Sequence, residues 1–232
     1  MTSDQIFSLA VQIVVFLFAI SVHESAHAWT ASRYGDPTAR MLGRVSLNPI
    51  RHIDPIGTVL LPLMAYIAHI PMIGWAKPTP VNPLNFRKNY VLADIMTSVA
   101  GPASNLIVAT IAVAVMTVIS ATSMTGKAIV VMVAGTFGRY MPRGESLLIP
   151  IVALLYNAML LNVLLAVFNL IPIPPLDGSH VLRHMLSDSA RNLYDRIGWV
   201  GLILFFLVGG RFLSFLMLPI VSFFNSILLG LA

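Results

Sequence analysis

Two histidines and a glutamate lie inside an apolar run of membrane length, and this combination restricts both the fold and the chemistry of the chain. The motif is His23-Glu24-Ser25-Ala26-His27, in a run from about Gln5 to Tyr34. On a helix, histidines four positions apart share a face and can bind one metal ion, while the glutamate reaches a water on that metal. This arrangement is typical of zinc hydrolases. Without a metal, the same side chains would hydrogen-bond to neighbouring helices, but a glutamate at membrane depth is costly and indicates a functional role.

The composition predicts an integral, multi-pass membrane protein. Of 232 residues, 57% are hydrophobic and 10% are charged, and the mean hydropathy is +0.86. The formal charge of +5 does not indicate nucleic acid, because the basic residues are scattered singly around apolar segments, where lipid headgroups are the expected partner. The absence of cysteine leaves histidine, aspartate and glutamate as metal ligands.

The distribution of basic residues predicts the orientation of the first span. No lysine or arginine precedes Arg33, whereas Arg40, Arg44 and Arg51 follow it closely. The positive-inside rule therefore places the N-terminus outside and the histidine motif near the cytoplasmic face.

We expect an all-α polytopic membrane protein with a three-helix catalytic core and flanking helices. The core spans are about Gln5 to Tyr34, Asp94 to Ser120 and Leu147 to Phe168. Residues 197–231 form either one kinked span or two short ones. No internal repeat is visible, so we expect one domain over residues 1–232 with its core in 5–186.

A short membrane-associated β-hairpin or re-entrant segment is expected between the first two core spans. Residues 38–48 partly alternate between apolar and polar side chains, which favours a strand or hairpin. The run from Ile56 to Trp75 contains proline and has basic flanks on both sides, which favours a re-entrant segment over a tilted span. The proline-rich residues 74–83 are predicted to be extended, with an open edge.

Two further motifs lie at the expected core. The small residues of Gly101-Pro102-Ala103-Ser104-Asn105 allow close helix packing, and Asn105 either bonds between helices or orients the site. In Asn169-Leu170-Ile171-Pro172-Ile173-Pro174-Pro175-Leu176-Asp177-Gly178, three prolines prevent the helix from continuing. This irregular segment is expected near the cytoplasmic end of its span, at the depth assigned to His23 and His27.

Taken together, these motifs resemble the site-2 protease family of intramembrane zinc metalloproteases, in its compact bacterial type without PDZ or CBS domains. The resemblance implies one Zn²⁺ per chain, with His23, His27 and Asp177 as ligands, in a bacterial cytoplasmic membrane. It also implies that Glu24 is the general base. Asp177 has an alternative role as a helix N-cap, and the pair His180 and His184 is a rival source of ligands.

The resemblance also suggests residues that contact the substrate. Asn169 is a candidate to bind the scissile carbonyl as it becomes an oxyanion, or alternatively to cap the preceding span. A membrane helix must unwind before cleavage, and the edge at Gly74, Trp75 and Ala76 could pair with the unwound chain. These three residues, together with Asn105, are the candidate substrate-binding residues.

The sequence therefore predicts a zinc endopeptidase that cleaves within or near transmembrane segments of membrane-anchored proteins, or clears signal-peptide remnants. The alternative is a metal-binding transporter or a non-catalytic relative that binds helices. A transporter would be expected to carry acidic residues at matching depth on several spans, whereas Asp94 lies near an end and the other spans have none at their centres.

Overall fold

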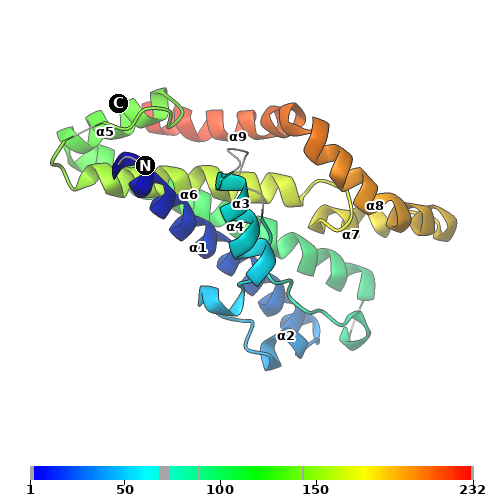
Figure 1. Ribbon diagram of the computed structural model, residues 1–232. Coiled ribbons are helices and arrows are strands. Elements are labelled where there is room, and N and C mark those ends of the chain that lie inside the picture. The colour runs from blue at the N-terminus through cyan, green and yellow to red at the C-terminus, as the bar shows by residue number, and fades with distance from the viewer. Residues whose placement is uncertain (1–2, 68–73, 88, 143, 231–232) are drawn as a thin grey trace.

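The computed structural model describes residues 3–67, 74–87, 89–142 and 144–230, and its regular structure is helical throughout these ranges (Figure 1). Three long apolar helices form the framework: α1 (Ser3–Tyr34), α4 (Tyr90–Thr122) and α6 (Leu148–Asn169). Helix α4 packs against both α1 and α6, and Figure 1 shows the three side by side. The predicted three-helix core is therefore present.

Four helices in the described ranges are long and apolar enough to cross a membrane: residues Leu9–Tyr34 of α1, α4, α6 and α9 (Gly210–Gly230). The C-terminal apolar region is divided at Gly209 into α8 (Asp188–Val208) and α9. Of the two forms considered for residues 197–231, the structure therefore has two helices, of which α9 meets the criteria for a span.

A buried apolar core lies between α4, α5 (Met124–Gly135), α6 and α9. Its largest fully buried side chains include Tyr156, Met116 and Met159, and the hydroxyl of Tyr156 donates to Asn225 Oδ1 at 3.1 Å. This core holds α6 against α4 over most of its length, so the end of α6 has a fixed position relative to α1.

The predicted β-hairpin is wrong, because residues 38–48 bond locally instead of pairing. The Asp36 carboxylate accepts from the N–H of Thr38, where α2 (Thr38–Met41) begins. The backbone N–H groups of residues 41–44 donate to carbonyls only three to five residues away. The last of these bonds runs from the N–H of Arg44 to Ala39 O. They therefore have no donor left for a partner strand.

The re-entrant segment is likewise not supported by the described residues. Residues 49–67 form the 3₁₀ turn η1 (Pro49–Arg51), the π-helical turn η2 (Pro55–Leu60) and α3 (Leu61–Ile67), while 68–73 lie outside the description. Residues 74–82, which were predicted to be extended, have neither a helical nor a strand assignment. They lead through the turn η3 (Pro83–Asn85) into α4.

The last short helix, α7 (Asp177–Arg183), follows the proline-rich segment after α6 and packs against α4. The proline-rich segment has no helical assignment between Leu170 and Leu176, as predicted. It brings Asp177 back over the part of α1 that carries His23 and His27.

Candidate metal centre

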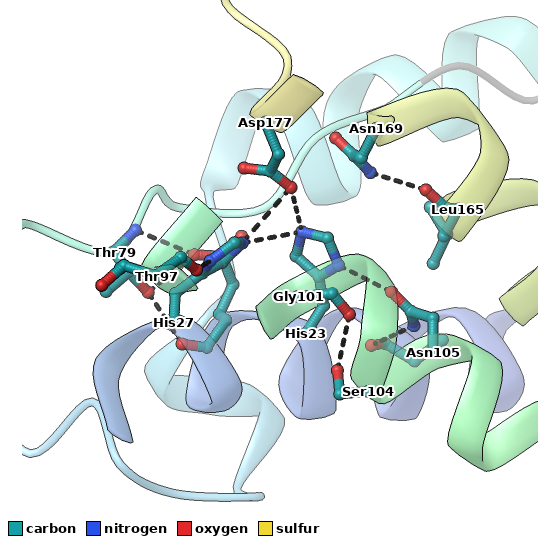
Figure 2. Close-up of polar contacts among 12 residues, drawn as sticks. His23, His27, Thr79, Thr97, Gly101, Ser104, Asn105, Leu165, Asn169 and Asp177 are labelled. Carbon is teal, nitrogen blue, oxygen red and sulfur yellow. Dashed lines mark hydrogen bonds and ion pairs between the residues drawn. The ribbon is translucent and has the colours of Figure 1, made fainter. Parts of the chain in front are cut away.

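The two histidines of the motif lie side by side on α1, and both are buried with 7% exposure. Their Nε2 atoms are 3.0 Å apart (Figure 2). The Nδ1 of His23 lies 2.6 Å from the Oδ1 of Asn105, and the Nδ1 of His27 lies 2.7 Å from the backbone oxygen of Thr97. Both oxygens accept hydrogen bonds only, so each Nδ1 carries the proton and each neutral ring presents an Nε2 lone pair to the other.

Asp177, the first residue of α7, completes this group. Its Oδ2 lies 3.1 Å from His23 Nε2 and 3.4 Å from His27 Nε2 (Figure 2). The atom is shielded from solvent and accepts no hydrogen bond within the described structure. An aspartate is ionised near neutral pH, and a cation bound between these three atoms would favour its carboxylate form further.

Three acceptor atoms thus converge without a donor between them, and this arrangement fits a cation. In the described ranges, His23, His27 and Asp177 are the one group of three or more potential ligands whose ligand atoms all lie within 4.8 Å of one another. Two imidazole nitrogens and one carboxylate oxygen match the donor set of a catalytic zinc, which leaves a fourth position open.

Gly101 makes the space for this group from the facing helix α4. A Cβ at this position would lie 2.6 Å from His23 Cε1 and 2.7 Å from its Nε2, and closer still to His27 Nε2. Any larger residue would therefore press on the two Nε2 atoms that face Asp177. The close packing predicted for the Gly101 motif is confirmed, and at Gly101 it leaves room for the rings of His23 and His27.

Glu24 lies beside the two histidines and is held by Thr79 from the extended segment. The backbone N–H and the hydroxyl of Thr79 lie 2.8 and 2.7 Å from Glu24 Oε2, and the same hydroxyl lies 3.0 Å from the Glu24 backbone oxygen. Figure 2 shows Thr79 on the His27 side of the site. These bonds leave Oε1 without a hydrogen-bond partner in the described structure.

A cavity of about 480 Å³ adjoins the metal centre and connects it with the extended segment. Glu24, His23, His27 and Asp177 line it on one side. The predicted substrate-binding residues Gly74, Trp75 and Ala76 line it as well. Trp75 packs against Gly57 of η2, where a Cβ would collide with the indole ring.

The two candidate asparagines have different positions. Asn169 lines the cavity, and its Nδ2 donates to Leu165 O at 2.9 Å, a bond within α6. Asn105 is fully buried, is not among the residues that line the cavity, and bonds to His23. This geometry favours the orienting role considered for Asn105 and gives no support to substrate binding.

Several residues of the site were not predicted. Asn162 on α6 accepts from Asn105 Nδ2 at 2.7 Å, which fixes the amide that orients His23. Thr79 and Thr97 were also missed, since a bond across 55 or 70 residues leaves no local pattern in the sequence. A buried asparagine on an apolar span, as at 162, was the available signal.

His180 and His184 bind Asp94 rather than the metal centre. Their ring nitrogens lie 3.3 and 2.7 Å from Asp94 Oδ2. The hydrogen bond to Asp94 raises the pKa of His180. Their use as rival metal ligands is therefore not supported, and they instead connect α7 to α4.

An all-helical membrane protein with two histidines, one carboxylate and a glutamate around one cavity has the features of a metallohydrolase. The sequence profile of Peptidase family M50 matches residues 11–208, and the chain therefore belongs to this family. The resemblance to site-2 proteases is confirmed, and the chain is a zinc metalloprotease with Zn²⁺ as its cofactor.

Two relatives carry names that agree with this assignment. The chain is 33% identical over 193 residues to "Putative zinc metalloprotease YwhC" of Bacillus subtilis (strain 168). The matched region covers 83% of this chain and 77% of that protein. It is 27% identical over 190 residues to "Putative zinc metalloprotease Rip2" of Mycolicibacterium smegmatis (strain ATCC 700084 / mc(2)155). This second matched region covers 81% of this chain and 62% of that protein. No solved structure gives a significant match.

Proposed function

We propose that this metalloprotease is an intramembrane endopeptidase, which hydrolyses peptide bonds within or near transmembrane segments of membrane-anchored proteins. The observation that carries the proposal is the shared cavity, in which Glu24 and the metal-binding group face an extended segment beside membrane-length helices. Regulated release of membrane-anchored proteins and clearance of signal-peptide remnants both require this reaction.

In this proposal, His23, His27 and Asp177 hold the zinc ion, whose chemistry is to polarise a water and the scissile carbonyl. Glu24 accepts the proton of the attacking water on its free Oε1 and delivers it to the leaving amine. Asn169 lies on the cavity wall, where an Nδ2 hydrogen not used by Leu165 O can donate to the developing oxyanion. Each role is assigned to a side chain that already faces the cavity.

A substrate helix must unwind before it can be cleaved, and Ala76 offers a partner for the unwound backbone. The backbone N–H groups of Trp75 and Lys77 donate to Gly57 O and His52 O at 3.1 and 2.8 Å. In an extended chain, neighbouring residues point to opposite sides, so the N–H and C=O of Ala76 face away from these bonds. Neither group is bonded to another described residue, and we propose that they pair with substrate.

We further propose that the chain forms one domain in a bacterial cytoplasmic membrane, with its N-terminus outside. The arginines that follow α1 support this orientation. His27 lies seven residues before the end of α1 at Tyr34, or about 10 Å along the helix, which places the site toward the cytoplasmic face. Because the chain has no cysteine, single cysteines introduced near each end of α1 can test this with an impermeant thiol reagent.

The experiment that tests the proposal maps the cleaved bond. Purified full-length protein is incubated in detergent with a single-span reporter, and the products are identified by mass spectrometry. A scissile bond within or directly beside the transmembrane segment supports the proposal. Cleavage confined to soluble tails or loops would contradict it, and so would equal cleavage of an unfolded soluble protein.

A further inference from the structure

The Glu24 carboxylate depends on one residue for its position. A glutamate side chain has three rotatable torsions, and in the described structure Thr79 is its one hydrogen-bonding partner. The N–H and the hydroxyl of Thr79 both lie within 2.8 Å of the same oxygen, Oε2. Two donors on one oxygen fix the carboxylate and leave the second oxygen, Oε1, free to act.

Thr79 is itself held in place by its neighbours in the chain. Pro78 and Pro80 on either side restrict the backbone, since each proline fixes its own φ and limits the residue before it. The N–H of Lys77 donates to His52 O at 2.8 Å, and the N–H of Asn82 donates to Asp36 Oδ2 at 2.7 Å. The donors that contact Glu24 therefore sit in a segment anchored on both sides.

From this geometry we propose that Thr79 is a positioning residue for catalysis, which holds Oε2 of Glu24 so that Oε1 faces the attacking water. The inference rests on the proposed role of Glu24 as general base. A base that moves by about 1 Å from its productive position can lose about 100-fold in rate, so an anchored carboxylate has a direct kinetic benefit.

The same contacts allow a second interpretation, which the experiment must distinguish from the positioning of Glu24. Thr79 lines the cavity next to Ala76 and Pro78, so it could serve substrate binding instead. A binding residue changes KM, whereas a residue that positions the base changes kcat at constant KM.

The kinetic test compares Thr79→Val, which removes the hydroxyl but keeps the backbone N–H, with Thr79→Ser, which keeps both donors. On the single-span reporter, we expect Thr79→Val to lower kcat by about 10-fold or more, with KM and bound zinc unchanged within about twofold. Thr79→Ser should restore kcat to within about threefold. Thr110→Val is the matched control, because in the described part of the chain the Thr110 hydroxyl donates to Leu106 O of its own helix.

A second measurement needs no substrate, because Glu24 and Glu145 are the two glutamates of the chain. Carboxylate-¹³C glutamate in a Glu145→Gln background therefore labels Glu24 alone, and its infrared carboxylate stretch reports hydrogen bonding. Thr79→Val should shift this band, while Thr79→Ser and Thr110→Val should leave it in place.

An unchanged band or unchanged kcat in Thr79→Val would overturn the inference, as would a rise in KM alone or a loss of zinc. These outcomes differ from failure of the proposed function. That failure would appear in the wild-type protein, as cleavage outside the transmembrane segment, whatever residue occupies position 79.

Discussion

Each histidine of the metal centre has one ring nitrogen bonded to a neighbouring oxygen and the other turned toward its partner. Asn105 fixes the ring of His23 and the Thr97 carbonyl fixes that of His27. Such outer contacts hold metal-binding rings in one tautomer and orientation. The residue pattern His-x-x-x-His predicts the pair of rings, but the partners that orient them lie on α4 and cannot be identified from the motif.

The closest packing at the centre involves Gly101, and we expect Gly101→Ala to lose zinc. The added methyl group would overlap the nitrogens of His23 and His27 that bind the metal. Purified Gly101→Ala protein should carry less than about a tenth of the wild-type zinc, measured by atomic emission after removal of free metal. Gly135→Ala is the control, because a Cβ there meets no atom within 4 Å. Wild-type zinc content in Gly101→Ala would refute this account of the packing.

At the scale of elements, α7 is joined to α4 by the contacts of Asp94 with His180 and His184. The side chains of Asp94 and His184 are 8% and 10% exposed. Because Asp177 is the first residue of α7, this connection also sets the position of the third metal ligand.

We therefore expect Asp94→Ala to lower zinc affinity by about 10-fold, in the range found for residues that support metal ligands. Competition with a zinc chelator measures the affinity, and hydrogen exchange should become faster in residues 177–183. Asp195→Ala is the control, because it removes a more exposed ion pair of α7, between Arg183 at its end and Asp195 of α8. If Asp94→Ala binds zinc as tightly as the wild type, α7 does not depend on Asp94.

A second connection joins the end of α1 to the extended segment through the Asp36 carboxylate. Oδ1 accepts from the N–H of Thr38 at 3.1 Å and from Nδ2 of Asn85 at 2.8 Å, while Oδ2 accepts from the N–H of Asn82 at 2.7 Å. Burial raises the pKa of Asp36, but these donors lower it more, so the net pKa lies below the ordinary value.

The sign of the pH effect follows from this lowered pKa. Asp36 contributes stability that is fully present above its unfolded pKa of about 3.9 and is lost as the pH falls through the lower folded pKa. At pH 7 in detergent, the free energy of unfolding of Asp36→Asn should be about 1.5–3 kcal/mol lower than that of the wild type. The difference should shrink below about pH 4. A constant difference from pH 7 to pH 3 would contradict the assignment.

The elements show how much of the fold the sequence could predict. The long apolar runs at Gln5–Tyr34 and 147–168 appear as α1 and α6, because length and hydropathy alone determine a span. The hairpin at 38–48 was wrong because its alternation is weak, and the local hydrogen bonds from Asp36 and within α2 satisfy the backbone instead. The absence of a helix at 74–82 was predicted correctly, since closely spaced prolines exclude one.

At the scale of the whole molecule, four separated parts of the chain meet at one cavity: α1, the segment around Thr79, the start of α4, and the stretch from the end of α6 to α7. The proximity of Asp177 to the His23 and His27 pair could be predicted, because arginine and proline positions assigned all three to the same end of their spans. The contact between Thr79 and Glu24 could not, because it depends on the tertiary path of a segment 55 residues away. Motifs therefore predicted the ligands better than the residues that orient them.

The central claim is that His23, His27 and Asp177 hold zinc while Glu24 performs proton transfer, and the most direct test measures both properties in the same samples. Zinc per chain and cleavage of the single-span reporter are determined for wild type, Glu24→Gln and Asp177→Ala. The account predicts that Glu24→Gln keeps its zinc but loses cleavage by at least about 1,000-fold, while Asp177→Ala loses both. Full cleavage by Glu24→Gln, or a fully active wild type without zinc, would contradict it.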